Sequence, residues 1–175
     1  RQQGGSSGTT TLTLKGSAAT LSSLNTDINV IEGSQVTGAI KLAAADRPST
    51  AMTITTGLGD DEIAMENSAD VITAGLGTDT LSISGNGVLG GFAVDLTADD
   101  QVTQWNGVSN ATVQSGIDSV TGSGVTGSYG VDFTGNADAN TLTGSSNVDT
   151  LRGGGGADTI VQTTGVDHLY GGAGA

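Results

Sequence analysis

Cysteine, basic residues and aromatic residues are scarce in this chain of 175 residues. Because Cys is absent, neither a disulfide framework nor a thiolate metal site is available. Only 5 Lys and Arg stand against 18 Asp and Glu, so nucleic acid is excluded as a partner for want of cations to meet its phosphates. Aromatic residues make up 3% of the chain, too few for a thick core built on large rings.

Long apolar runs and catalytic motifs are also missing. No apolar stretch approaches the ~20 residues that span a bilayer, so we expect no transmembrane segment. The only histidine, His168, cannot build a zinc site with two or three histidines, and no HExxH motif, nucleophile elbow or phosphate loop is present. The paired acids Asp60 and Asp61 would point to opposite faces of a strand. The sequence therefore predicts that this chain is not an enzyme.

Glycine, aspartate and small aliphatic residues are what the chain has in abundance. It contains 30 Gly, and its 35% hydrophobic residues are mostly Val, Ile, Leu and Ala mixed with many Thr. This mixture is typical of short strands on a thin sheet. The formal net charge is -13. Such acidity either keeps the surface soluble or supplies oxygen ligands for a hard cation such as Ca²⁺.

The C-terminal stretch aligns without gaps when it is cut every nine residues. Its units read GNADANTLT, GSSNVDTLR, GGGGADTIV and QTTGVDHLY from Gly135 to Tyr170, followed by an incomplete GGAGA. The sixth position of the four units holds Asn140, Asp149, Asp158 and Asp167. The eighth position holds a large aliphatic residue in every unit. Four units in phase indicate a true repeat.

A second array lies upstream, where the units from Thr56 to Ser82 read TGLGDDEIA, MENSADVIT and AGLGTDTLS. Their sixth position holds Asp61, Asp70 and Asp79. Asp79 and Asn140 are 61 positions apart, which nine does not divide, so a segment of different geometry must separate the arrays. We therefore divide the chain into an irregular β segment or entry coils (1–50), a first calcium-binding array (51–82), an irregular β-helix connector (83–134) and a second array (135–175).

Each unit can be understood as a turn followed by a short strand. Glycines at positions one, two and four allow a tight turn whose carbonyl oxygens point inward, and the aspartate at position six adds charge there. The next three residues, such as Thr159-Ile160-Val161, alternate outward, inward and outward. Two units make one coil of about 18 residues, so turns on one edge recur at every second unit.

This arrangement predicts which residues share an edge. Asn140 and Asp158 share one edge with the turn at Gly171, while Asp149 and Asp167 share the opposite edge. Upstream, Asp61 and Asp79 share an edge opposite Asp70. Ca²⁺ would lie between stacked turns and reach ~6–8 oxygen ligands. The candidate ligands are Gly57, Gly59, Asp61, Asp70, Gly75, Gly77, Asp79, Asn140, Asp149, Gly153, Gly154, Gly156, Asp158, Asp167, Gly171, Gly172 and Gly174.

These units resemble the hemolysin-type, or RTX, calcium-binding nonapeptide repeats, most closely at GGGGADTIV. The segment from GGFAVDLTADDQ to the start of the second array also resembles the connecting element that precedes such arrays. The resemblance implies a parallel β-roll, Ca²⁺ in the turns and export by a type I secretion apparatus. Met65, Glu66 and Ser68 replace turn glycines, Asn140 replaces an aspartate, and 162–164 lack glycine, so these turns are expected to bind weakly or not at all.

We expect a structural module of a secreted, self-assembling bacterial surface layer at the extracellular cell surface. Its partners would be calcium ions and other copies of itself, and the chain would be a fragment of a longer protein. Two alternatives remain open. An RTX adhesin or ice-binding repeat requires a flat outward ladder such as Thr141, Thr150 and Thr159, which His168 interrupts. The other alternative is the C-terminal secretion half of an exported protease or lipase.

Outside the arrays, alternating apolar residues predict strands at 11–14, 28–31, 36–42 and 92–96. We expect Trp105, the only Trp, to cover an edge of a coil.

Overall fold

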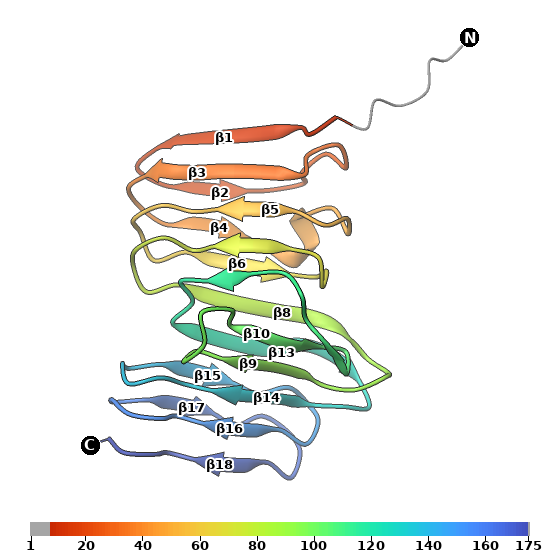
Figure 1. The fold of residues 1–175 in the computed structure, drawn as a ribbon, viewed down its shortest axis with the longest axis vertical. Helices are drawn as coiled ribbons and strands as arrows, with labels where there is room; N and C mark the ends of the chain where they lie inside the picture. The colour runs from red at the N-terminus through yellow and green to blue at the C-terminus, as the bar shows by residue number, and fades with distance from the viewer. Residues whose placement is uncertain (1–7, 175) are drawn as a thin grey trace.

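The computed structural model describes residues 8–174, which wind into a parallel β-roll whose coils stack along its long axis (Figure 1). Each coil adds strands to two opposing faces, from the N-terminal coils in red to the C-terminal coils in blue (Figure 1). The predicted all-β solenoid is confirmed. Within 8–174 the only helical element is the short 3-10 helix η1 (Ala44–Asp46).

One face is a single seven-stranded sheet, and all of its strands are parallel. In spatial order its strands are β2 (Ala19–Leu21), β4 (Ile40–Leu42), β6 (Glu62–Met65), β8 (Thr80–Gly87), β13 (Ser119–Gly127), β15 (Thr141–Thr143) and β17 (Thr159–Val161).

The opposite face consists of two sheets. The five-stranded sheet is parallel and contains β1 (Thr11–Gly16), β3 (Val30–Val36), β5 (Thr53–Thr55), β7 (Val71–Thr73) and β12 (Gln114–Ser115). The six-stranded sheet contains β11 (Val108–Ser109), β10 (Val102–Trp105), β9 (Phe92–Asp95), β14 (Val131–Thr134), β16 (Thr150–Arg152) and β18 (His168–Tyr170). In this sheet β10 pairs antiparallel with both β9 and β11.

The register within each array confirms a coil of 18 residues. Thr53 pairs with Val71 in the first array, and Thr141 pairs with Thr159 in the second. The eighth-position residues stack in columns, so that Ile63, Leu81, Leu142 and Leu151 are fully buried, whereas Leu169 in the last coil is 41% exposed. Each such side chain contributes about 1.5–3 kcal/mol on burial. In the arrays the narrow core is therefore built from stacked aliphatic residues, and Phe92 and Phe133 join it in the connector and beside the second array.

The N-terminal coils differ from the predicted strands. The expected single strand at 36–42 is wrong, because β3 ends at Val36 and β4 begins at Ile40 on the other face. The chain turns the corner at Gly38, where an added Cβ would collide with the carbonyl oxygen of Ser17 in the coil before. These coils are longer than those of the arrays, since Ala19 pairs with Ile40, 21 residues later.

The connector continues the roll but carries an insertion. Ser119 pairs with Thr80, 39 residues earlier, and Thr121 pairs with Thr143, 22 residues later. These unequal spacings put the two arrays out of phase. The extra residues include the hairpin formed by β10 and β11. Trp105 on β10 packs edge-to-face on Phe92, with ring centroids 4.9 Å apart, and so adds to the core at this end of the coil.

The turns between the two faces form two rims that run along the roll. We call the turns that lead into the seven-stranded sheet the entry rim. In and between the arrays these turns are 56–61, 74–79, 116–118, 135–140 and 153–158. The turns that leave the seven-stranded sheet form the exit rim, which includes 66–70, 144–149 and 162–167. The aspartates predicted as ligands lie on these rims.

Candidate metal centre

On the entry rim, each aspartate holds the corner of the coil before it. One carboxylate oxygen of Asp61 accepts the backbone N–H of Ile40 at 2.6 Å, and Asp79 accepts that of Asp61 at 2.8 Å. In the second array, Asp158 accepts the backbone N–H of Asn140 at 3.0 Å. The structure thus stacks Asp61 with Asp79 and Asn140 with Asp158, as their spacing of 18 residues predicts.

The other carboxylate oxygen of these aspartates has no partner. The Oδ2 atoms of Asp61, Asp79 and Asp158 are buried and accept no hydrogen bond from any residue in 8–174. A buried carboxylate oxygen without a donor is strongly unfavourable, because it has lost its water and gained nothing in return. A bound cation removes this penalty. The donor set of the entry rim, hard oxygens from carboxylates and backbone, fits Ca²⁺.

The structure adds Asp118 to the entry rim, a residue that the sequence prediction missed. Its Oδ2 accepts the backbone N–H of Asp79 at 2.8 Å, and its carbonyl oxygen accepts the side-chain amide of Asn140 at 2.8 Å. The local signal was present, because Asp118-Ser119-Val120 repeats the pattern of an acid followed two places later by an aliphatic residue. The insertion places Asp118 at a distance of 39 residues from Asp79, which is not a multiple of nine, so the periodic alignment did not include Asp118.

The crowding of carboxylates changes the proton affinity of the entry rim. The pKa of Asp79 is raised to about 7, mainly because the carboxyl group is buried and also because the carboxylates of Asp61, Asp118 and Asp60 lie nearby. The hydrogen bond from the backbone N–H of Asp61 acts the other way. Without a metal ion, this site therefore competes for a proton near neutral pH.

The glycines of the entry rim let successive turns stack closely. Gly154 and Gly156 have φ angles of +99° and +85°, which side-chain-bearing residues rarely adopt. A Cβ on Gly154 would also collide with the carbonyl oxygen of Asn136 in the turn before. Gly75 and Gly77 are likewise left-handed, whereas Gly57 and Gly59 are not among the residues with positive φ.

A small cavity lies between the last two turns of the entry rim. Its volume is about 180 Å³. Its lining consists of Gly156, Asp158, Ile160, Gly171, Gly172 and Gly174. Five of these six residues are predicted ligands, so the cavity lies among the residues that the sequence proposes as ligands in the second array.

On the exit rim, the aspartates differ from one another in whether both carboxylate oxygens are bonded. Asp149 accepts hydrogen bonds at Oδ1 from the backbone N–H of Val131 at 2.8 Å and from the Ser145 hydroxyl at 2.7 Å. Its Oδ2 accepts the backbone N–H of Ser145 at 2.7 Å. The protein itself therefore satisfies both oxygens of Asp149. In the next turn, Asp167 bonds the backbone N–H of Asp149 through Oδ1 at 3.1 Å, and its Oδ2 has no partner within 8–174.

Asp70, also on the exit rim, has a buried arginine as its counter-ion. The Nη2 atom of Arg47 lies 2.7 Å from Asp70 Oδ1, and both side chains are completely buried. The same oxygen accepts the backbone N–H of Met52 at 2.9 Å, and Oδ2 accepts those of Glu66 and Asn67 at 3.3 and 3.2 Å. Both oxygens of this predicted ligand are thus occupied.

Asn140 is a structural link between coils. Its Oδ1 accepts the backbone N–H of Asn136 at 2.8 Å, and its Nδ2 donates to Asp118. Because its amide is neutral, Asn140 contributes no charge to a cation, although it lies directly before Asp158 in the stack.

In the described part of the chain, side chains alone do not form a metal site. Within residues 8–174 no group of three or more His, Cys, Asp or Glu side chains lies close enough together to hold an ion. Any bound calcium therefore requires backbone carbonyl oxygens besides one or two carboxylates. The glycine turns are the part of the chain suited to supply them.

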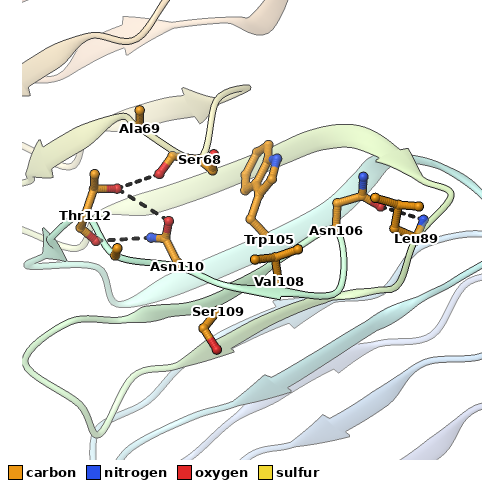
Figure 2. Close-up of a pocket in the computed structure, with 10 residues that line it drawn as sticks. Ser68, Ala69, Leu89, Trp105, Asn106, Val108, Ser109, Asn110 and Thr112 are labelled. Carbon is orange, nitrogen blue, oxygen red and sulfur yellow. Dashed lines mark hydrogen bonds between the residues drawn. The ribbon is translucent and has the colours of Figure 1, made fainter.

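A larger cavity of about 450 Å³ lies beside the inserted hairpin (Figure 2). Trp105 stands in it, and the Thr112 hydroxyl closes one side by donating to the Ser68 carbonyl oxygen at 2.7 Å (Figure 2). The side chain of Asn110 donates to the carbonyl oxygen of Thr112 at 3.1 Å. None of the residues that line this cavity carries a carboxylate, imidazole or amine side chain that could act as a general acid or base.

His168 points outward from β18, as predicted. The position-seven residues fall on two faces, because Thr141 pairs with Thr159 on the seven-stranded sheet while Thr150 pairs with His168 on the six-stranded sheet. They therefore do not form one threonine ladder. Among the described residues, no helix has the length and apolar character needed to cross a membrane.

Comparison with known families supports the repeat. The family model described as RTX calcium-binding nonapeptide repeat (4 copies) matches residues 53–81, 132–161 and 163–175. The matched segments include both aspartate arrays and leave out the N-terminal coils and the inserted hairpin. No curated protein and no solved structure matches the chain.

Proposed function

On the premise that this chain carries RTX calcium-binding nonapeptide repeats on a parallel β-roll, we propose that it is a calcium-stabilised structural module of a secreted bacterial surface-layer protein. The observation that carries the proposal is the column of buried, unpartnered carboxylate oxygens on the entry rim, at Asp61, Asp79 and Asp158. These oxygens make the folded coil unfavourable until a cation binds between the turns.

Calcium binding would then complete the folding of the roll. The cation would neutralise the stacked carboxylates, while the aspartates keep holding the backbone of the coil before them. Extracellular calcium modules commonly bind at ~10⁻⁴–10⁻³ M, so the chain would stay loosely folded in calcium-poor cytosol. This behaviour suits passage through a type I secretion apparatus and folding outside the cell.

A structural role without catalysis accounts for the surface of the roll. Its outward positions in the arrays are mostly small polar residues, and the large cavity lacks titratable groups. Flat, repetitive faces of this kind suit side-by-side contact with other copies in a surface lattice. The separation of Thr141 and Thr159 from Thr150 argues against the ice-binding alternative, which needs one continuous ladder.

Calcium titration of the full chain tests the metal site. We expect the β signal in circular dichroism to fall in chelator and to return with calcium, and calorimetry to count the bound ions. An unchanged spectrum after complete calcium removal would contradict the proposal. The variant Asp79→Asn should bind fewer ions, while Asp138→Asn, which changes an exposed carboxylate of the same rim, should bind the wild-type number.

The surface-layer role needs a separate test on the parent protein. We expect electron microscopy to show ordered two-dimensional sheets when calcium is added, and dispersed particles in chelator. Catalytic domains in the parent sequence, together with dispersed particles in calcium, would instead favour the secretion half of an exported enzyme.

A further inference from the structure

We propose that the Arg47 guanidinium is a built-in replacement for calcium at the 66–70 turn of the exit rim, so that this turn is closed without a metal ion. The inference rests on the proposed function, since it assumes that the other turns bind calcium. It concerns Asp70, which the repeat pattern places among the ligands but which the fold pairs with an arginine.

Asp70 occupies the same structural position as the aspartates of the entry rim. Its Oδ1 accepts the backbone N–H of Met52, 18 residues earlier, just as Asp79 accepts that of Asp61. The difference lies in the remaining acceptor capacity. Asp79 keeps an Oδ2 without a partner, whereas both oxygens of Asp70 are bonded. Asp70 has a guanidinium as its counter-ion, whereas within 8–174 no cationic side chain pairs with Asp79.

Arg47 also contacts a backbone carbonyl, as a calcium ion in such a turn would. Its Nη1 donates to the carbonyl oxygen of Ala64 at 2.6 Å, close to where the chain leaves β6. One planar cation thus joins the carboxylate at the end of the turn to a carbonyl before its start. A guanidinium suits this role because it is always charged and its donors have a fixed geometry.

The sequence around the turn fits a site without metal. The 65–73 unit reads MENSADVIT, so its turn lacks the glycines that stack closely on the entry rim. Arg47 reaches it from the long loop that follows η1, and neither Arg47 nor Asp70 is exposed to water. A buried charge of this kind is tolerated only when its partners are in place, so the pair fixes the loop against the coil.

The consequence is a roll with unequal dependence on calcium. The coil formed by β6, the 66–70 turn and β7 keeps a closed exit rim at any calcium concentration. It therefore offers an ordered edge on which calcium-dependent coils can add. We expect hydrogen exchange in the full chain under chelator to show stronger protection at Met52 and Glu66 than at Thr159 and His168.

Replacing Arg47 tests the assignment directly. In Arg47→Ser the carboxylate of Asp70 loses its counter-ion, and the space left by the guanidinium opens beside it. We expect the thermal midpoint in chelator to fall by on the order of 10 °C. Calcium should recover most of this loss, and calorimetry should count one more ion per chain than in wild type. The matched control Arg152→Ser, which breaks an exposed pair with Asp132, should change neither quantity.

A second variant keeps the proposal testable if Arg47→Ser does not fold. Arg47→Met/Asp70→Asn removes both charges, and we expect it to bind the same number of calcium ions as wild type. If it binds one ion fewer, or if Arg47→Ser folds but gains no ion, Arg47 is not a stand-in for calcium. If wild type itself binds no calcium, the proposed function fails, which is a different result from these.

Discussion

On the entry rim, Asp61, Asp79 and Asp158 each leave one buried oxygen without a partner, whereas on the exit rim Asp70 and Asp149 have both oxygens bonded. All five hold the backbone of the preceding coil in the same way. Asp167, also on the exit rim, keeps an Oδ2 without a partner in 8–174, as the entry-rim aspartates do. The turns thus share a structural use of aspartate and differ, one by one, in what satisfies its second oxygen. A repeat can therefore keep its shape while individual turns gain or lose the need for a metal ion.

The largest expected effect comes from replacing all three entry-rim aspartates that keep an unpartnered oxygen. We expect Asp61→Asn/Asp79→Asn/Asp158→Asn to lose the stabilisation by calcium, about 2.7 kcal/mol for each ion lost at a calcium concentration 100 times Kd. Asn keeps an oxygen for the backbone N–H, so the fold should persist. Urea unfolding with calcium and with chelator measures the effect. A midpoint in the triple variant that still rises with calcium as in wild type would refute the assignment.

The glycine turns of the entry rim offer a neighbouring pair of positions that should respond differently. Gly154→Ala should cost about 3 kcal/mol, because Ala resists the positive φ and its Cβ would collide with the carbonyl oxygen of Asn136. Gly155→Ala should stay within about 0.5 kcal/mol, since the nearest atom to its Cβ would lie 3.4 Å away. Chemical denaturation in calcium compares the two. Equal losses would mean that close stacking does not limit this rim.

A variant of Ser145 tests whether protein groups alone satisfy the carboxylate of Asp149 on the exit rim. Ser145→Ala removes the hydroxyl that donates to Asp149 and should cost about 2 kcal/mol. The cost should be the same in calcium and in chelator, because protein groups already satisfy this carboxylate. Ser146→Ala, at the exposed neighbouring position, serves as the control for denaturant unfolding. A cost that appears only in calcium would place a metal ion at Asp149.

The smallest expected effect is a pH dependence confined to the entry rim. The pKa of Asp79 is raised to about 7, so between about pH 4 and 7 the folded, metal-free chain binds a proton that the unfolded chain has released. The stability of the metal-free chain should therefore fall as pH rises through this window.

Calcium binding should change with pH in the opposite sense. Because the ion must displace this proton, calcium affinity at the Asp79 site should weaken by about tenfold from pH 8 to pH 6. Calorimetry on wild type and on Asp79→Asn, which lacks the titrating group, separates this site from the others. The same pH dependence in both proteins would assign it elsewhere.

Much of the roll could be predicted from the letters of the repeat. The 18-residue spacing places Asp61 beside Asp79, and the alternation of the strand sends Ile160 inward and His168 outward. Asp118 was not predicted as a rim residue, because the insertion interrupts the nine-residue period before it, although the residues around it keep the local pattern of the repeat. The end of β3 and the start of β4 were not predicted either, because only the contact of Gly38 with the preceding coil shows where the chain turns.

By itself, the sequence determined the coil length, the inward aliphatic columns and the rims on which the aspartates stack, since all three follow from a fixed period along the chain. Only the tertiary structure decided which carboxylates keep an unpartnered oxygen. Arg47 reaches Asp70 across 23 residues from a loop outside the repeat. The charge balance of a buried carboxylate depends on donors from other coils, and the period of the repeat carries no information about a partner that does not repeat.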